Sequence, residues 1–224
     1  YDAKIAEGQR AWEQLIADVP TVNWTVLDPL EFVSEAGAVI DEREDHSLIV
    51  GGNGNIPAND TYVVTADVDL ERVTALRLEM LASPDLPSNG PGLADDGNFV
   101  LSEFKVLAAP LTARGASNSN PQPVKLTMCV ADWSQEGFPA EQSIDGDPKT
   151  AWAINPQFGK PHTATFLTKT PIGNSDEMQL LFTFDQGYGG GRTIGRLRLS
   201  AMTGLPVTAA VPAAIAKVLD RPVK

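Results

Sequence analysis

The chain of 224 residues and 23.9 kDa is long enough to bury the core of one large domain or two small ones. Its formal charge of −12 leaves no basic stripe that could displace condensed counterions. Nucleic acid and anionic membrane surfaces are therefore poor partners, whereas neutral glycans, cations and basic proteins remain open. No run of about eighteen apolar residues is present, so the sequence does not predict membrane insertion.

The two ends of the chain are predicted to lie outside the main domain. Apolar residues recur at helical intervals before Pro20, which predicts a packed helix within the helix or linker segment 1–23. These residues are Ile5, Trp12, Leu15 and Ile16. Residues 207–224 consist mostly of Ala, Val and Pro, and we expect them to form a linker toward a following domain. Because the chain starts at Tyr1 without a Met or a signal peptide, we expect it to be a piece of a longer protein.

Between these ends, short runs of alternating apolar and polar residues predict an all-β domain over residues 24–206. Turns are plentiful, with 19 glycines and 17 prolines in the chain. The expected strands cover residues 24–27, 38–40, 47–50, 61–68, 73–81, 99–106, 124–131, 162–168, 178–184 and 193–202. We expect one sandwich of about ten strands, not two sandwiches split near Ser117, because about five strands on each side of the 107–123 connection are few for a two-sheet core.

The single cysteine, Cys129, lies between Met128 and Val130 in one of these alternating runs. It cannot form an internal disulfide, so it leaves the redox compartment undecided. We expect a buried, small apolar side chain, with a reactive thiol as the alternative.

Two irregular segments carry groups that could bind a ligand. The loop 83–97 ends in Asp95 and Asp96, which form either a candidate cation site or a pair of solvated acids. The glycine-rich loop 185–192 carries Tyr188 and Arg192. These two side chains can bind a sugar by ring stacking and a bidentate donor, or they can belong to an ordinary mobile hairpin.

The segment 143–152 is an acidic Gly/Pro turn that runs into a Thr-x-Trp pair. Asp145 and Asp147 offer hard carboxylate oxygens, and the hydroxyl of Thr150 returns to the same place. Ca²⁺ takes about six to eight oxygen ligands and accepts backbone carbonyls among them, so the loop predicts a calcium site. The alternative is an Asx turn in which the carboxylates accept hydrogen bonds from local N–H groups.

The pattern Ser-Ile-Asp-Gly-Asp-x-x-Thr-x-Trp at 143–152 resembles the signature loop of discoidin-type domains, the coagulation factor V/VIII type C domains, and of related carbohydrate-binding modules. The resemblance implies a galactose-binding-like jelly-roll fold, a core position for Trp152 and a structural Ca²⁺. In that family, a Glu in a Ser-Glu-aromatic-x-Val strand completes the metal cage, and the matching residue is Glu103. The strand of Glu103 precedes the loop, whereas the family strand follows it.

Blocks over most of the chain are similar to the non-catalytic β-domain of large planctomycete proteins that also carry cytochrome c-like domains. The blocks are residues 74–79, 89–92 through 103, 137–139, 150–162 and 193–200. This resemblance implies an extracytoplasmic location, periplasmic or at the cell surface, with neighbouring domains in the parent chain. No Cys-x-x-Cys-His motif is present, so any covalent haem would belong to a different part of the parent protein.

The sequence offers little material for catalysis. Its two histidines, His46 and His162, are too few for a His-based metal centre, and no serine-hydrolase or zinc-protease motif occurs. A carboxylate pair for glycoside hydrolysis would need two acids at a defined separation, and no pair stands out. We therefore do not expect an enzyme.

These patterns together favour a non-catalytic polysaccharide-binding module. Loops at one end of a sandwich are free for ligands because the sheet faces form the core and the strand edges pair. The predicted ligand residues are Trp133, Tyr188, Arg192 and, as a neighbour, His162, and the predicted Ca²⁺ ligands are Asp145, Asp147, Thr150 and Glu103. A docking domain that positions neighbouring haem or catalytic domains is the alternative, followed by a glycan-active enzyme.

Overall fold

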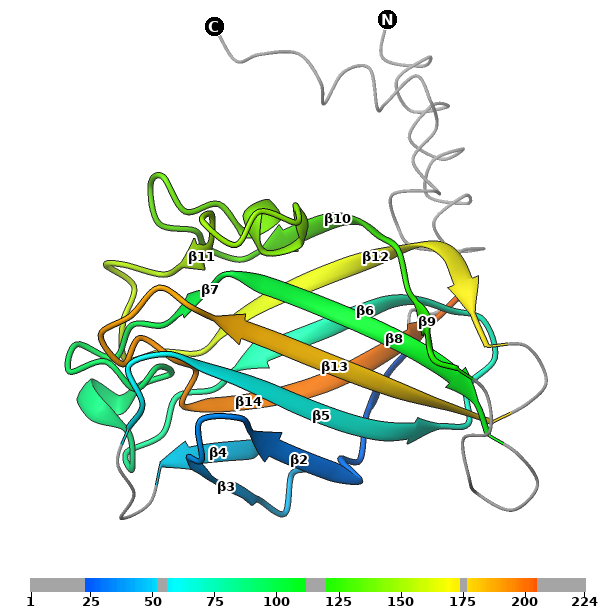
Figure 1. Ribbon diagram of the computed structural model, residues 1–224, viewed down its shortest axis with the longest axis horizontal. Coiled ribbons are helices and arrows are strands. Elements are labelled where there is room, and N and C mark those ends of the chain that lie inside the picture. Colours follow the sequence, from blue (N-terminus) through cyan, green and yellow to red (C-terminus); the bar gives the residue numbers. More distant parts are fainter. Residues whose placement is uncertain (1–22, 52–55, 112–119, 174–176, 205–224) are drawn as a thin grey trace, which may run out of the picture.

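The computed structural model describes residues 23–51, 56–111, 120–173 and 177–204. This part of the chain is all-β, with two antiparallel sheets packed face to face (Figure 1). Its helical turns are two short 3-10 segments, η1 (Pro87–Asn89) and η2 (Ala140–Ile144). In the residues described, no helix is long and apolar enough to cross a membrane. The predicted N-terminal helix and the predicted C-terminal linker lie outside the described residues.

The strands follow one another along the chain with short connections between most of them. They are β1 (Asn23–Val26), β2 (Glu31–Ser34), β3 (Val39–Glu42), β4 (Leu48–Gly51), β5 (Asp60–Val68), β6 (Val73–Met80), β7 (Val100–Leu101), β8 (Glu103–Pro110), β9 (Gln122–Pro123), β10 (Leu126–Ala131), β11 (Trp152–Ala153), β12 (His162–Ile172), β13 (Met178–Gln186) and β14 (Arg196–Thr203).

Each of the two large sheets draws strands from both halves of the chain. The seven-stranded sheet has the order β10-β12-β6-β14-β4-β3, with β1 also paired to β14. The five-stranded sheet has the order β2-β5-β13-β8-β9, and β7 and β11 form a separate two-stranded ladder. Neither sheet can be completed by the strands on one side of residues 112–119 alone, because β13 lies between β5 and β8, and β14 lies next to β6.

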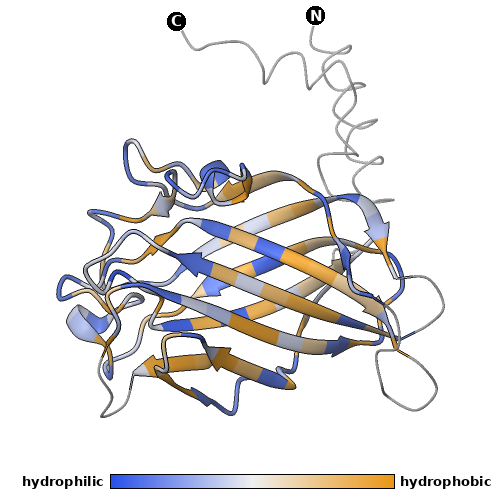
Figure 2. Cartoon of the chain, in the orientation of Figure 1, coloured by the Kyte–Doolittle hydropathy of each residue, from blue (hydrophilic) through white to orange (hydrophobic). Residues whose placement is uncertain are grey.

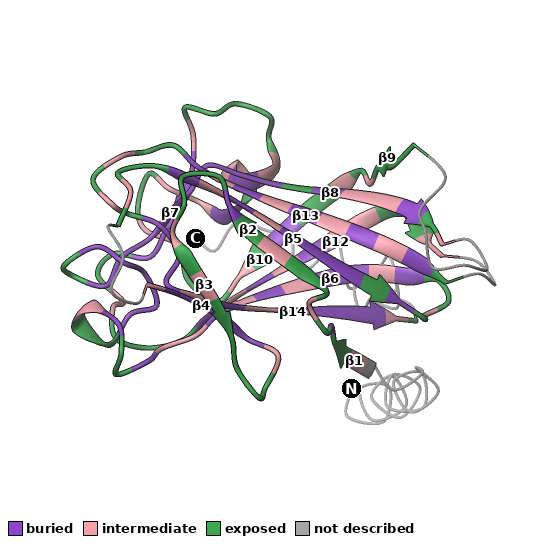
Figure 3. Ribbon diagram, turned by 60° about the horizontal axis from the view of Figure 1, so that its bottom comes forward, coloured by how far each residue is buried: buried purple, intermediate pink, exposed green. Residues whose placement is uncertain are grey.

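Strict alternation of apolar side chains explains the central strands. Along β13, every second residue is buried, and β5 and β6 show similar patterns (Figures 2 and 3). Successive side chains of a strand point to opposite faces, so one face of each strand lines the space between the sheets. The expected strands in these regions agree with the structure to within a few residues.

Two short strands escape the sequence pattern. β2 and β9 occupy the two edges of the five-stranded sheet, where each pairs with a single neighbour. Val33 of β2 is 56% exposed, and both residues of β9 are exposed. An edge strand buries little surface, so it lacks the alternation that marks a central strand.

The core between the sheets is centred on a group of phenylalanines. The Phe104 ring of β8 lies 4.4 Å from the Phe166 ring of β12 in the opposite sheet, and 5.2 Å from its cross-strand partner Phe184. Trp152 is also fully buried, with its ring edge-on to Phe99, as the sequence predicts. Cys129 is buried as well, and burial raises the pKa of its thiol to about 12.

Replacement of Phe104 should remove the main contact between the two sheets. We expect Phe104→Ala to lower the free energy of unfolding by about 3–5 kcal/mol, because the cavity cannot close fully between two rigid sheets. Urea unfolding followed by tryptophan fluorescence would measure the loss. Val33→Ala on exposed β2 is the matched control and should change the unfolding free energy by less than about 0.5 kcal/mol. Equal losses in the two variants would contradict this account of the core.

Candidate functional site

Several long loops gather at one end of the sandwich, at the left of Figure 1. They are residues 81–99 after β6, 132–151 before β11, 154–161 after it, and 187–195 between β13 and β14. The loops contact one another through backbone hydrogen bonds. The Gly159 N–H donates to the carbonyl of Gly90, and the Leu93 N–H donates to that of Thr193. This end therefore carries most of the non-strand surface that the structure describes.

The predicted cation loop begins where η2 ends, at Asp145. The Asp147 N–H donates to Oδ1 of Asp145 at 2.8 Å, which closes an Asx turn. The Thr150 hydroxyl lies 2.8 Å from Oδ2 of Asp145 and 2.8 Å from the carbonyl oxygen of Asp147. The Lys149 N–H donates to Oδ1 of Asp147. Hydrogen bonds thus bring Asp145 and Thr150 together, while the Asp147 carboxylate turns toward Lys149.

Glu103, the first residue of β8, lies beside this loop although it is some forty residues earlier in the sequence. The backbone N–H of Gly146 lies near its carboxyl group and lowers its pKa, and Gly146 has the positive φ of 84° that the turn requires. The Glu103 residue is 4% exposed, and its Oε1 atom has no hydrogen-bond partner among the described residues. The adjacency of Glu103 and the 143–152 loop that the sequence predicts is therefore present.

Burial raises the pKa of Glu103, and the Gly146 N–H and the Lys105 ammonium only partly oppose this shift. The nearby carboxylates of Asp145 and Asp185 raise it further. A buried, unpartnered carboxylate oxygen next to a second carboxylate is unfavourable without a cation or a proton. The Asp145, Thr150 and Glu103 oxygens fit the donor types that Ca²⁺ prefers, and the Asp147 side chain would have to turn to join them.

The aromatic part of the loop surface is held by a second set of contacts. Tyr188 is 52% exposed, and its ring packs edge-on against Phe138 at 5.6 Å. The Arg192 guanidinium lies 5.9 Å from the centre of the Tyr188 ring, and its Nη1 is 3.5 Å from the carbonyl of Gly189. The ring is thus supported on the protein side and open to solvent elsewhere.

Trp133 is 38% exposed and lies in the same segment as Phe138. Its carbonyl accepts a hydrogen bond from the indole of buried Trp152, and its own Nε1 lies 3.4 Å from the carbonyl of Asn155. The backbone at Trp133 is therefore anchored to the core while part of its ring faces solvent. Phe138, which connects this segment to Tyr188, was not among the predicted site residues, although the Gly-Phe-Pro block at 137–139 marks it in the sequence.

His162 does not share the exposure of the other predicted ligand residues. It is 1% exposed, its Nδ1 is 3.0 Å from Oδ2 of Asp132, and its Nε2 is 2.7 Å from the carbonyl of Gln157. With both ring nitrogens occupied, the imidazole joins β12 to two loops and offers nothing to a ligand. Its place at the start of β12, where the side chain points inward, explains the difference from the expectation.

Two hollows flank this end of the sandwich. One, of about 400 Å³, is lined by three carboxylates together with polar and small residues: Glu35, Asp60, Asp185, Ser102 and Pro148. The other, of about 480 Å³, includes Asp95, Asp96 and Arg192 in its wall. Asp95 and Asp96 are exposed, and Oδ1 of Asp96 accepts the Asn98 N–H at 2.9 Å, so this pair serves the local turn. The acidic lining favours neutral or cationic groups over anionic ones.

The described part of the chain is thus an all-β domain of two packed antiparallel sheets with its long loops at one end. No protein-family model matches the chain, and no curated protein matches it significantly. Among solved structures, the enzymatically active domain of bacteriophage CBA120 tailspike protein 4 is similar over 83% of this chain and 19% of that one, with 10% sequence identity and a TM-score of 0.24. The chain thus spans about a fifth of the length of that protein chain.

Glu103 should make the metal-free protein less stable at neutral pH. Its folded-state pKa is raised, so its contribution to stability is present below its ordinary value of 4.5 and is lost as the pH rises through the folded value. In buffer with EDTA, Glu103→Gln should therefore gain stability relative to the wild type between about pH 4 and pH 7.

Urea unfolding at the two pH values would measure this gain. Glu136→Gln, an exposed glutamate of the 132–151 loop, is the control and should stay within about 0.5 kcal/mol of the wild type at both. A Glu103→Gln variant whose free energy of unfolding falls relative to that of the wild type between about pH 4 and pH 7 would refute this account of the carboxyl group.

Proposed function

We propose that this domain is a non-catalytic polysaccharide-binding module with a galactose-binding-like jelly-roll sandwich. The observation that carries the proposal is the pair of part-exposed aromatic rings, Trp133 and Tyr188, both tied to the 133–138 segment at the loop end. Sugar rings stack on such faces through their C–H groups, and Arg192 beside Tyr188 adds a donor for hydroxyl oxygens.

The ligand class follows from the acidic residues elsewhere at this end of the domain and from the net charge of the chain. The hollow next to the 143–152 loop is lined by Glu35, Asp60 and Asp185, and the chain as a whole carries −12. Carboxylates accept hydrogen bonds from sugar hydroxyls but repel uronic acids and sulfated sugars. A neutral polysaccharide therefore fits better than an acidic one. The resemblance to the β-domain of planctomycete proteins supports an extracytoplasmic location, where such polymers occur.

Removal of either exposed ring should weaken binding to a neutral polysaccharide. A stacked aromatic contributes about 1–3 kcal/mol, so Trp133→Ala and Tyr188→Ala should each raise the dissociation constant roughly tenfold or more. Affinity electrophoresis against a panel of neutral and acidic polysaccharides would first identify the ligand and then compare the variants.

Leu30→Ala is the control, because Leu30 is an exposed large apolar side chain outside the loop end. Its binding should equal that of the wild type. All three variants should keep the wild-type unfolding midpoint, since none of these side chains fills the core. The proposal is wrong if both loop variants bind as the wild type does, or if the wild type binds no polysaccharide in the panel. Either result would favour a docking domain.

A structural Ca²⁺ held by Asp145, Asp147, Thr150 and Glu103 forms the second part of the proposal. Its support is the unpartnered, buried Oε1 of Glu103 beside Asp145, together with the resemblance of the loop to discoidin-type domains. The ion would neutralise this carboxyl pair and fix the 143–152 loop, which ends at buried Trp152.

Calcium should raise the thermal stability of the protein. A ligand at about one hundred times its dissociation constant adds about 2.7 kcal/mol, so melts in excess CaCl₂ and in EDTA should differ by several degrees. Asp145→Asn keeps an oxygen for the Asp147 N–H but removes the charge, and it should abolish the difference. Asp96→Asn, in the other acidic loop, should retain it. If the melting temperature of the wild type is the same in CaCl₂ and in EDTA, hydrogen bonds alone hold the loop.

A docking domain that positions neighbouring domains of the parent chain is the second candidate. One observation favours it: β10 lies at the edge of the seven-stranded sheet and exposes Met128 and Val130. Both residues lie on β10, outside the loop end. Val130→Asp would therefore disturb docking to a neighbouring domain without affecting polysaccharide binding. A glycan-active enzyme ranks third, because the sequence singles out no carboxylate pair for glycoside hydrolysis.

A further inference from the structure

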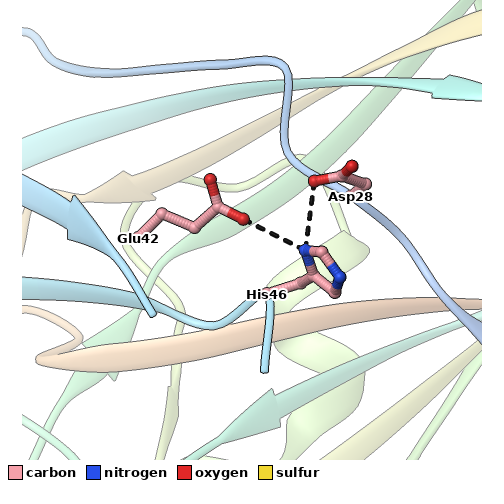
Figure 4. A group of neighbouring side chains, drawn as sticks. All are labelled: Asp28, Glu42 and His46. Carbon is pink, nitrogen blue, oxygen red and sulfur yellow. Dashed lines mark hydrogen bonds and ion pairs between the residues drawn. The ribbon is translucent and has the colours of Figure 1, made fainter. Parts of the chain in front are cut away.

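We propose that Asp28, Glu42 and His46 form a binding site for a divalent transition-metal cation of the Zn²⁺ type (Figure 4). One ligand atom from each residue lies within 4.8 Å of the other two. The site lies apart from the 143–152 loop and is independent of the proposed sugar and calcium sites.

Two segments bring these ligand atoms together, the stretch after β1 and the β3–β4 hairpin. Asp28 follows β1, Glu42 ends β3, and His46 lies in the turn that joins β3 to β4. Nδ1 of His46 is 3.1 Å from Oδ1 of Asp28 and 3.1 Å from Oε1 of Glu42. Figure 4 shows both carboxylates directed at the same ring nitrogen. The pairing of β3 with β4, which sets Glu42 opposite Leu48, holds the turn in place.

The distances suit a small tetrahedral ion. Zn²⁺ binds imidazole nitrogen and carboxylate oxygen at about 2.0–2.2 Å, so two of its ligands lie roughly 3.3–3.5 Å apart. The two separations from Nδ1 of His46, 3.1 Å each, would need to widen by only a few tenths of an ångström, and the Asp28 and Glu42 oxygens lie within 4.8 Å of each other. An imidazole and two carboxylates match Zn²⁺ and similar ions, whereas Ca²⁺ prefers oxygen ligands alone. The side chains are part exposed, so water can supply the fourth ligand.

The charges around Asp28, Glu42 and His46 favour the binding of a cation. Two carboxylates face one imidazole, so the group keeps a net negative charge even when His46 is protonated. The neighbouring charged residues are paired elsewhere: Arg43 with Asp85, and Asp45 with Arg196 and Arg198. Among the described residues, neither Asp28 nor Glu42 has an ion pair with Lys or Arg. A proton on Nδ1 is therefore the competitor of the metal, and binding should strengthen as the pH rises.

The backbone of His46 supplies a clean test of the imidazole. Its φ of 58° lies in the left-handed region, where glycine is favoured and a branched side chain is costly. Its N–H donates to the carbonyl of Arg43 in the turn, a bond that any residue except proline can make. His46→Gly therefore removes the ligand while it suits the turn better than the native residue.

The test is isothermal titration calorimetry of ZnCl₂ into the full chain, stripped with EDTA and dialysed, at about pH 8, because the carboxylates of Glu42 and Asp28 raise the pKa of His46 and a more acidic buffer would favour the competing proton. Wild-type protein should bind one Zn²⁺. His46→Gly and Glu42→Gln should each weaken binding by about tenfold or more, because loss of a direct ligand costs at least as much as loss of an outer-shell partner. Glu44→Gln, an exposed acid of the same turn, is the control and should bind as the wild type does.

Thermal melts in EDTA would confirm that the variants are folded, and His46→Gly should melt at or above the wild-type temperature. The change in melting temperature with CaCl₂ should be the same in His46→Gly as in the wild type, so failure of the calcium proposal is distinguishable from failure of this one. Equal Zn²⁺ affinity in the wild type and His46→Gly, or no Zn²⁺ binding by the wild type, would overturn the proposal and leave a proton as the bridge between the carboxylates.

Discussion

The two sheets depend on packing across a shared apolar core, and the contact between Phe104 and Phe166 lies within it. Phe104 belongs to β8 of the five-stranded sheet and Phe166 to β12 of the seven-stranded sheet, so their packing fixes the distance between the layers. Neither strand could present its ring without neighbours from the other half of the chain, because β8 pairs with β13 and β12 with β6. The domain is therefore expected to fold as one cooperative unit.

This packing also reaches the loop end of the sandwich. Glu103 precedes Phe104 on β8, so the ring that anchors the strand in the core sets the position of the carboxyl group beside Gly146. Trp152 has a similar role on the other side, since its buried indole donates to the carbonyl of Trp133. The part-exposed surface of Trp133 and the acidic loop thus rest on rigid elements of the core. Such support reduces the conformational entropy that a binding surface loses when it captures a ligand.

The sequence predicts those parts of the fold that depend on periodic burial. β5, β6 and β13 were predictable because alternate residues are buried along their length, and β2 and β9 were not because edge strands bury little. The Asx turn at Asp145 follows from local residue types. The burial of His162 could not be anticipated, since its partners Asp132 and Gln157 come from two loops whose paths the sequence does not define. The approach of Asp28 to Glu42 and His46 could not be predicted either, because the sequence does not define the path of the segment that carries Asp28.

The pairing of Asn23 with Thr203 has a consequence for how the domain can be built into a larger protein. The described domain begins at β1 and ends at β14, and these two residues are cross-strand neighbours, about 5 Å apart. The first and the last described strands thus meet at one point, at the far end of β14 from the 187–195 loop. A domain with such geometry can be inserted into a surface loop of a host protein without forcing the host's flanking segments apart, and it would hold its loop end outward, away from the host.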